Sequence, residues 1–347
     1  MHKEAINKLL HNPFYLHTDR DHTMSSFLLK YLDIKMHQLI DSDLYDRITV
    51  IGLHDRNSTT ISSKEKPGKR YNWQRPTAHL DGRNLIICCY PGRDYVRHYS
   101  SLIGTYLALT GRNPKIVKYI YPTEAESWNS IQSINLSEVG HKNLVIVGYG
   151  LDSIFSDSSW TENDAFWHSQ YVINGQHATL LLIKHSFWGD IAGYVARKLA
   201  ETGFQRIVFV GKLGSLRPGD KPNECLATGT SSLVEGELVQ WNNLFSSPMP
   251  DYVKIGTHIC VPSVIYETKP WASLAVRGFD FVDPEIGHMA RETLRMGAEF
   301  SYLHLVSDNV YQQGTENLSN ERMHAILNKR VHMKQRIGEV LLSSLMF

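Results

Sequence analysis

The chain has 347 residues, of which 42% are apolar, so it is long enough to bury a large core and to hold two domains. Its 36 basic and 35 acidic residues give a net charge of +1, and no basic stripe indicates a nucleic-acid surface. The longest apolar runs are too short to cross a bilayer, and the first residues lack the apolar core of a signal peptide. We therefore expect a cytoplasmic protein that binds neither nucleic acid nor a membrane.

Residues 1–140 alternate between helical and strand-like patterns. The predicted elements are a helix at about Ser25–Leu44, strands at Ile48–Leu53 and Leu85–Tyr90, a helix at Tyr95–Leu109 and a strand at Lys115–Ile120. Adjacent Cys88 and Cys89 point to opposite faces of the second strand, which is typical of small core residues and not of a disulfide framework. The polar, breaker-rich stretch Asn57–Tyr71 predicts an exposed loop.

Residues 141–347 continue the alternation with apolar strands and longer helices. The predicted strands are Leu144–Gly148, Ala178–Ile183, Arg206–Val210, Tyr252–Val261 and Phe300–Val306, and the predicted helices include Asp190–Thr202 and Glu321–Leu345. This order predicts an α/β fold with a central mixed, largely parallel sheet flanked by helices. We expect an extra N-terminal α/β region of unknown role in residues 1–140 and a second domain in residues 141–347.

Two acidic residues stand at the ends of two predicted buried elements. Asp283 is a good helix N-cap and Pro284 suits the first helical position, which places Glu285 in the first turn, where the helix dipole favours an anion. Asp308 lies just beyond the carboxyl end of the last predicted strand. In open α/β sheets ligands bind at the carboxyl ends of strands, so both acids are candidates for one pocket.

The same segment resembles the C-terminal signature of the purine nucleoside phosphorylase and nucleosidase superfamily. Val-Asp-Pro-Glu at 282–285, then a helix and an apolar strand ending in Ser-Asp at 307–308, is similar to the family's Val-Glu-Met-Glu, helix and Ser-Asp. Upstream, the stretches Asn143–Phe155, Ala178–Asp220 and Ile255–Thr268 are similar to further family motifs in the same order. The resemblance covers roughly residues 143–315 and implies a nucleoside phosphorylase-like catalytic domain.

The resemblance implies roles for three catalytic candidates. Glu285 matches the family glutamate that accepts hydrogen bonds from the ribose 2′- and 3′-hydroxyls, a task that a carboxylate suits because it can accept two bonds at once. Asp308 matches the acid that protonates the purine as the glycosidic bond breaks. His185 matches a loop histidine that approaches the sugar or an anion, although a surface-loop histidine would look the same.

Further candidates concern the base and an anion. Tyr266 and Trp271 are candidates to stack on a base or, alternatively, to pack in the core. The remaining substrate-binding candidates are the glycine turn Gly148 and Gly150 and the glycine-rich loop Gly211 and Lys212. The family's phosphate ligands are an arginine and a Ser or Thr, and here their positions hold Phe209 and Lys212. Lys212 could bind an anion, fill the phosphate site and leave water as the nucleophile, or simply point to solvent.

Two more groups of charged residues remain open. Arg93 and Arg97, at a strand end and a helix start, suit a substrate phosphate if residues 1–140 fold over the pocket, and are otherwise surface arginines. The run His-Thr-Asp-Arg-Asp-His at 17–22 has no accompanying Cys-x-x-Cys or His-Glu-x-x-His, so we expect no metal there. We expect no cofactor, with inorganic phosphate as a possible co-substrate.

These features favour an enzyme that cleaves the N-glycosidic bond of a small-molecule nucleoside, nucleotide or related N-riboside, with water preferred over phosphate as the nucleophile. One alternative is a phosphate-dependent phosphorylase that uses Lys212 and an N-terminal arginine. Another is a non-catalytic nucleotide-sensing protein of the same fold. The resemblance also implies a homo-oligomer.

Overall fold

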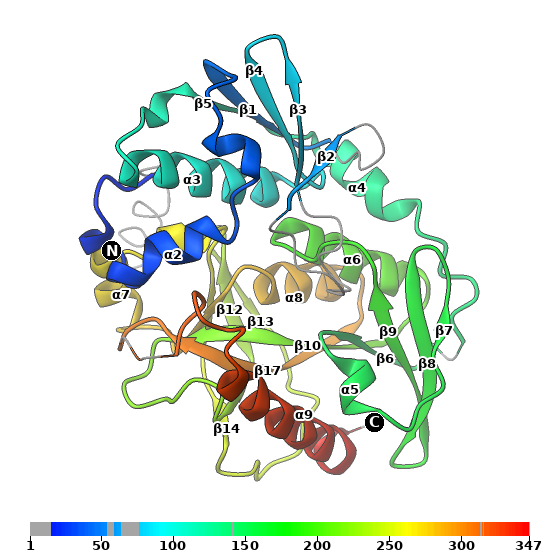
Figure 1. Cartoon of the computed structure of the whole chain (residues 1–347). Helices are drawn as coiled ribbons and strands as arrows, with labels where there is room; N and C mark the ends of the chain where they lie inside the picture. The colour runs from blue at the N-terminus through cyan, green and yellow to red at the C-terminus, as the bar shows by residue number, and fades with distance from the viewer. Residues whose placement is uncertain are drawn as a thin grey trace.

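The computed structural model describes residues 15–53, 59–63, 76–140, 142–312, 314 and 316–346. They form two β-sheets, one of five strands in the order β2-β3-β4-β1-β5 and one of twelve strands. Figure 1 shows the smaller sheet at the top, helix α3 below it, and helices α6 and α8 between α3 and the larger sheet. The chain passes from one sheet to the other between Ile120 and Leu144, near the predicted division at residue 140. That the two parts are separate domains stays a prediction.

The smaller sheet contains the three strands predicted in the N-terminal region. Its strands are β1 (Arg47–Ile51), β2 (Thr60–Ile61), β3 (Thr77–Asp81), β4 (Asn84–Cys88) and β5 (Val117–Ile120). Strand β1 lies in parallel between β4 and β5, while β2 and β3 add antiparallel pairs. Cys88 and Cys89 are buried and free, which confirms them as core residues. The predicted loop Asn57–Tyr71 lies mostly outside the described residues.

The long helix predicted over residues 25–44 is wrong. The segment forms a short helix α2 (Leu28–Asp33) between two single-turn 3₁₀ helices at Ser25–Phe27 and Gln38–Asp41. His37 has an extended backbone, and its Nδ1 accepts a hydrogen bond from the Leu39 N–H, so it starts a new turn in place of continuing the old one. Helix α3 (Arg93–Leu109) matches its prediction closely.

The larger sheet is mixed, as predicted, and its centre is parallel. Its central strands are β9 (Gln176–Ile183), β6 (Leu144–Gly148), β10 (Arg206–Ser215) and β17 (Glu299–Asn309), all parallel in that order. Antiparallel strands β8 (Phe166–Ile173) and β7 (Thr161–Glu162) extend one edge. The other side holds β16 (Phe281–Asp283), β15 (His258–Cys260), β12 (Ser231–Val234), β13 (Glu237–Gln240), β11 (Leu226–Thr228) and β14 (Val253–Ile255).

The predicted strand Tyr252–Val261 is divided in two. Strand β14 pairs with β11, whereas β15 pairs with β12 and β16, so the chain changes neighbours at Gly256 and Thr257. The Asp280 carboxylate holds this corner by accepting hydrogen bonds from the N–H and hydroxyl of Thr257. The sequence pattern did not reveal the corner, although β15 is buried whereas β14 ends at the exposed Ile255.

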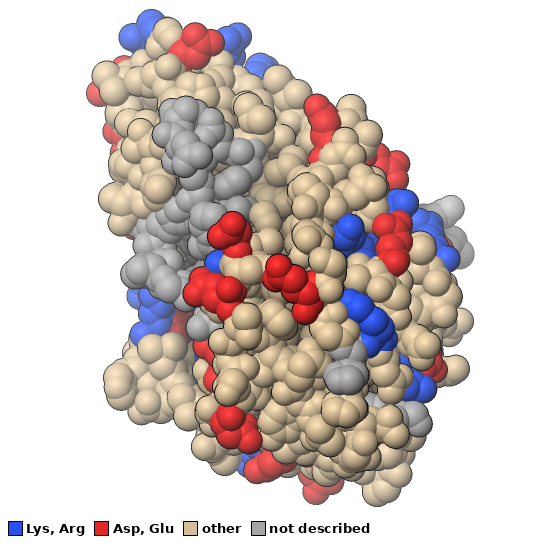
Figure 2. Space-filling model, turned by 90° about the vertical axis from the view of Figure 1, so that its right-hand side faces the viewer, with Lys and Arg blue, Asp and Glu red and all other residues tan. Residues whose placement is uncertain are grey.

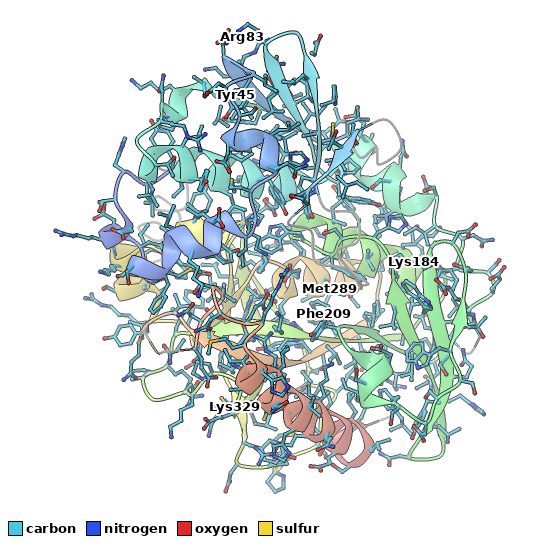
Figure 3. All side chains as sticks on the ribbon, viewed as in Figure 1. Tyr45, Arg83, Lys184, Phe209, Met289 and Lys329 are labelled. Carbon is cyan, nitrogen blue, oxygen red and sulfur yellow. The ribbon has the colours of Figure 1, made fainter. Side chains whose placement is uncertain are left out.

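Helices cover both faces of the larger sheet. The helices are α4 (Glu124–Gln132), α5 (Leu151–Ile154), α6 (Asp190–Glu201), α7 (Lys269–Ala275), α8 (Ile286–Arg295) and α9 (His324–Ser344). Helices α6 and α8 pack together above the sheet, and α9 lies below it beside α5 (Figure 1). Phe209 of β10 and Met289 of α8 are buried at the centre of the molecule (Figure 3).

Two further properties of the described residues are the distribution of charge on the surface and the length and apolarity of the helices. On the face in Figure 2, most of the described area is neither acidic nor basic, and the Lys, Arg, Asp and Glu side chains are scattered over it. Within the described ranges, no helix is both long enough and apolar enough to span a bilayer.

Candidate functional site

A cavity of about 210 Å³ lies at the carboxyl ends of the central strands of the larger sheet. Its wall is formed by the ends of β6, β10, β16 and β17, by the loop after β9, and by the 3₁₀ helix η6 (Val264–Tyr266) with the residue that follows it. Two segments close the cavity from outside the sheet, one from α2 and one just before α9. This is the position at which open α/β sheets bind their ligands.

Glu285 enters the cavity from the start of α8. The helix begins at Ile286, two residues later than the predicted first helical residue Pro284, so Glu285 is the N-cap and not part of the first turn. Asp283 still caps the helix through its side chain, because its Oδ1 accepts hydrogen bonds of 2.9 Å from the N–H groups of both Glu285 and Ile286. The carboxylate of Glu285 therefore stands at the positive end of a capped helix and faces the cavity.

Asp308 reaches the same cavity from β17. The strand continues through Asp308 to Asn309, beyond the predicted end at Val306, and pairs Asp308 with Gly214 of β10. Only 8% of Asp308 is exposed, and burial raises the pKa of its carboxyl to about 6, although a 2.8 Å hydrogen bond from Ser307 Oγ opposes the shift. Near neutral pH a carboxyl with this pKa is protonated in part of the molecules, and those molecules can donate a proton to a substrate.

A second buried acid, Glu267, lines the cavity beside Asp308 and was missed from the sequence. It is 5% exposed, and burial together with the charge of Asp308 raises its pKa well above the ordinary value. Two carboxyls that repel each other in a dry pocket share protons instead of both ionising. In the sequence Glu267 follows Tyr266 in an apolar stretch, and no local pattern marks it as anything but a loop residue.

Lys212 projects from β10 into the wall of the cavity and is paired there. Its Nζ lies 2.8 Å from Glu321 Oε2, and the same oxygen accepts a 3.2 Å hydrogen bond from Arg330 Nη1. Only 20% of the Lys212 side chain and 11% of the Glu321 side chain are exposed. The lysine therefore does not point to solvent, and a carboxylate of the chain itself already occupies the position beside its ammonium group.

Gly148 and Gly211 also line the cavity, and both are required by close packing. Gly148 has φ +147°, and a Cβ there would lie 1.9 Å from the Val210 carbonyl oxygen. A Cβ at Gly211 would lie 2.7 Å from His304 Nε2. Gly150 has φ +70° and packs under Lys334, outside the cavity lining.

Three other predicted residues lie outside the cavity lining. His185 stands with its ring 5.4 Å from that of Tyr90, and burial lowers its pKa to about 4, which keeps the imidazole neutral. Tyr266 is buried and accepts a 3.0 Å hydrogen bond from Arg97 Nε. Trp271 is fully buried in a separate core cluster behind the cavity wall. This is the placement that the alternative prediction, packing in the core, describes. Their proposed roles in catalysis and base binding stay predictions that this placement does not support.

The N-terminal region folds over the cavity, but not through the predicted arginines. Arg93 lies against the ring of Tyr121, with its guanidinium carbon 5.7 Å from the ring centre, and neither Arg93 nor Arg97 lines the cavity. The anion expected at the start of α3 is the chain's own Asp190, whose carboxylate accepts hydrogen bonds from the N–H groups of Arg93 and Asp94. A substrate phosphate would have to displace this carboxylate.

Tyr31 and Lys35 are the N-terminal residues that line the cavity instead. The Lys35 ammonium lies 5.3 Å from the centre of the Tyr31 ring. Neither residue belongs to a motif, and they precede the central strands by more than a hundred positions in the sequence, so only the folded chain reveals them.

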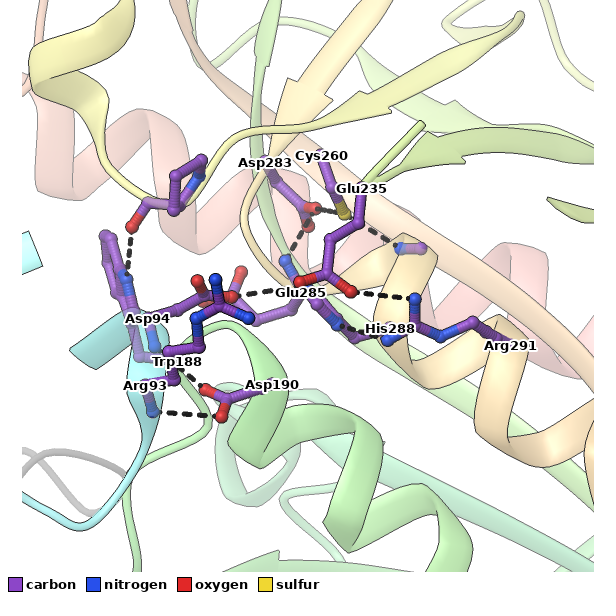
Figure 4. Close-up of polar contacts among 12 residues, drawn as sticks. Arg93, Asp94, Trp188, Asp190, Glu235, Cys260, Asp283, Glu285, His288 and Arg291 are labelled. Atoms are coloured by element: carbon purple, nitrogen blue, oxygen red, sulfur yellow. Dashed lines mark hydrogen bonds and ion pairs between the residues drawn. The ribbon is translucent and has the colours of Figure 1, made fainter. Parts of the chain in front are cut away.

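A buried polar cluster joins α3 to α6 and α8 beside the cavity. Figure 4 shows Asp94 between Asp190 and His288, with His288 Nε2 lying 3.2 Å from Asp94 Oδ2. Burial and the neighbouring Asp94 carboxylate raise the pKa of Asp190 to about 7. The contacts fix the N-terminal region against the helix that carries Glu285.

The lining of the cavity is acidic. Its described residues include five carboxyl groups and two lysines, which are Glu267, Asp283, Glu285, Asp308 and Glu321 against Lys35 and Lys212. Even with Glu267 protonated and Asp308 protonated in part, the remaining three carboxylates outnumber the lysines. Such a lining stabilises a substrate that becomes positively charged and opposes a free dianion.

Comparison with known proteins gives one curated relative and a set of structural neighbours. No family model matches the chain. The oxidoreductase cns1 of Cordyceps militaris is 25% identical over 256 residues, which are 64% of this chain and 32% of that protein. The chain therefore spans about a third of the length of the relative that it matches.

Three solved structures illustrate the neighbours, and each covers most of its own length. The 5′-methylthioadenosine/S-adenosylhomocysteine nucleosidase of Campylobacter jejuni has 12% identity and a TM-score of 0.44, over 58% of this chain and 97% of its own. Futalosine hydrolase of Helicobacter pylori has 10% identity and a TM-score of 0.42, over 58% and 96%. Uridine phosphorylase of Vibrio fischeri has 13% identity and a TM-score of 0.45, over 57% and 88%. These neighbours are all members of the nucleoside phosphorylase and nucleosidase superfamily, the family that the sequence motifs resemble.

Proposed function

We propose that the chain is an enzyme that cleaves the N-glycosidic bond of a nucleoside, nucleotide or related N-riboside, with water as the nucleophile. The observation that supports this most is the meeting of Glu285 and the buried acid Asp308 in one cavity, although they come from different elements. These two acids are also the residues at which the sequence resembles the superfamily most closely.

The proposed chemistry follows from the charges that develop as the bond breaks. The departing base gains negative charge, and Asp308 in its protonated form gives it a proton. The sugar becomes an oxocarbenium-like cation, which the surrounding carboxylates stabilise. Glu285 accepts hydrogen bonds from two ribose hydroxyls and so holds the sugar in place. Glu267, kept protonated by burial, offers a further hydrogen-bond donor at the base.

Water is favoured over phosphate as the nucleophile because the lysine at the glycine-rich loop is already paired and is not available to bind a phosphate dianion. Lys212 is neutralised by Glu321 at 2.8 Å, and the lining has more carboxylates than lysines. A phosphate dianion would meet repulsion from Glu321 and Glu285, whereas a neutral water molecule would not. The phosphorylase alternative therefore requires Glu321 to move away.

The substrate class and the nucleophile can be tested together. We expect purine or pyrimidine nucleosides, or their 5′-monophosphates, to release free base in phosphate-free buffer, at a rate that added phosphate does not raise. Chromatography of the base with and without phosphate measures this. Release only with phosphate would make the chain a phosphorylase, and tight binding without release of base would support the sensor alternative.

The variant Glu321→Gln is the companion to this experiment. Removing the carboxylate frees the positive charges of Lys212 and Arg330 near the cavity. Phosphate should then compete with the substrate and inhibit the variant, while the unaltered protein stays insensitive to phosphate. If phosphate inhibited neither protein, the Glu321 carboxylate would not be what prevents Lys212 from binding phosphate.

The pH dependence follows from the raised pKa of Asp308. Only the protonated carboxyl can act as the acid, and its pKa is about 6, so kcat/KM is expected to fall about tenfold per pH unit above that value. The same shift means that the folded protein loses stability as the pH rises from about 4 to about 6, because Asp308 ionises there in the unfolded chain but stays protonated in the folded one. A profile of kcat/KM from pH 5 to 9 tests the prediction, and activity that rises through this range would contradict it.

A further inference from the structure

A second cluster of reactive side chains lies directly behind the cavity, within the sheet. It brings together His258 and Cys260 of β15, Asp283 of β16 and His304 of β17. All four are buried, with exposed fractions of 0% for both histidines, 6% for Cys260 and 3% for Asp283. Asp283 also contributes to the cavity wall, whereas the mechanism above makes no use of His258, Cys260 or His304.

The pairing of the strands produces this cluster. His258 and Cys260 are two residues apart on one strand, so their side chains point to the same face. Strand β15 pairs in parallel with β16 in a register that sets Cys260 against Asp283. Strand β17 brings His304 from the other side, where its Nε2 lies 3.6 Å from Asp283 Oδ2.

The distances within the cluster match those between the ligands of one metal ion. A ligand atom from each of His258, Cys260 and Asp283 lies within 4.8 Å of the other two. His258 Nε2 and Asp283 Oδ1 are 3.0 Å apart. In a tetrahedral zinc centre with bonds of about 2.0–2.3 Å, neighbouring ligand atoms lie roughly 3.3–3.8 Å apart. The separations within the cluster, from 3.0 Å to at most 4.8 Å, bracket this range.

Two polar atoms at the centre of the cluster lack the hydrogen bonds that burial normally demands. They are His258 Nε2 and Asp283 Oδ2. The short separation of His258 Nε2 and Asp283 Oδ1 is therefore not a well-aligned hydrogen bond. Native interiors rarely leave two neighbouring polar atoms unsatisfied, which indicates an additional partner for them.

The surrounding groups prepare the same atoms to bind a cation. Ser232 Oγ lies 2.8 Å from His258 Nδ1, and a hydrogen bond donated by that nitrogen leaves the lone pair on Nε2, facing the cluster. The Gly287 N–H donates to Cys260 Sγ at 3.1 Å, but burial and the neighbouring Asp283 raise the pKa of the thiol, so a bound cation would have to displace its proton. The helix N–H groups occupy Asp283 Oδ1 and leave Oδ2 toward His304.

We propose that His258, Cys260 and Asp283 bind a divalent zinc ion, with His304 beside the fourth position. Nitrogen, thiolate sulfur and a single carboxylate oxygen form the donor set that zinc prefers over magnesium or calcium. The ion would stabilise the start of α8 and thereby the position of Glu285, two residues after Asp283. The sequence did not suggest the site because the three ligands lie on two strands, with more than twenty residues between Cys260 and Asp283.

Metal analysis of the full-length protein tests the site without any assay of activity. After exposure to zinc and removal of free metal, we expect about one zinc per chain. Cys260→Ser and His258→Gln should each bind zinc at least tenfold more weakly. Cys225→Ser is the matched control, because Cys225 is equally buried but lies outside the cluster, and it should keep the zinc.

Cobalt(II) provides a second readout that reports the thiolate directly. A cobalt-loaded protein should show a thiolate-to-cobalt charge-transfer band in the near ultraviolet, kept in Cys225→Ser and lost in Cys260→Ser. Circular dichroism checks that each variant is folded, and the near-isosteric Cys260→Ser decides the matter if His258→Gln does not fold. Unaltered protein that takes up neither zinc nor cobalt, or a folded Cys260→Ser variant with undiminished zinc, would overturn the proposal.

Discussion

Replacing Asp308 with asparagine is expected to lower kcat by about 10²–10⁴-fold, the usual contribution of a general acid. The amide has nearly the same shape as the carboxyl and its oxygen can still accept the hydrogen bond from Ser307, so the cavity should remain intact. It cannot supply a proton to the departing base. Steady-state kinetics with the best substrate of the panel measure the loss, and KM should change little.

The control for this variant is Asp251→Asn, which makes the same chemical change at an exposed position far from the cavity lining. Its kinetics should match those of the unaltered protein. The fall in activity above about pH 6 should also disappear in Asp308→Asn, because the group that titrates there has been removed. A variant with normal kcat would show that another residue, with Glu267 as the first candidate, protonates the base.

Replacing Glu285 with glutamine is expected to lower kcat/KM on the order of 100-fold. Hydrogen bonds to a charged acceptor contribute about 1.5–3 kcal/mol each, and the carboxylate is proposed to accept two of them from the ribose. Glutamine keeps one acceptor but presents an N–H group to the second hydroxyl. The loss should be measured on a riboside and on its 2′-deoxy analogue.

The comparison of the two substrates makes the Glu285 test specific. If the residue holds the hydroxyls, the deoxy substrate has already lost one of the bonds, so the variant should affect it much less than the riboside. Glu201→Gln, at an exposed ion pair with Arg197 on α6, should leave both substrates unaffected. Equal losses on the two substrates would mean that Glu285 acts on the position of α8 and not on the sugar.

The sequence predicted the central part of the molecule well because its signals are local. Strand β6 has the same bounds, Leu144–Gly148, in the prediction and in the structure, since a continuous apolar run there ends at a glycine that packing requires. Asp283 was predicted to cap α8 and does so through its side chain. The chemistry of Glu285 and Asp308 was proposed from the resemblance to the nucleoside phosphorylase and nucleosidase superfamily, since their local positions alone marked them only as candidates for one pocket.

The remaining part of the site depends on contacts between distant segments. Glu321 determines the state of Lys212, yet the two are more than a hundred positions apart and nothing in either local sequence indicates the pair. Glu267 looks like a loop residue until η6 folds it against Asp308. Arg93 and Arg97 were attractive as an anion site because the start of α3 needs an anion, and the structure supplies Asp190 for that purpose.

Tyr31 and Lys35 of the early chain and Glu321 near its end meet at one small cavity. During synthesis Tyr31 and Lys35 are made long before Glu321. The cavity therefore cannot be enclosed until the residues beyond β17 have been made. Contacts of such long sequence separation form late and slowly in folding. A chain interrupted at either end would therefore lose the enclosure altogether, because each end supplies a wall that the other cannot replace.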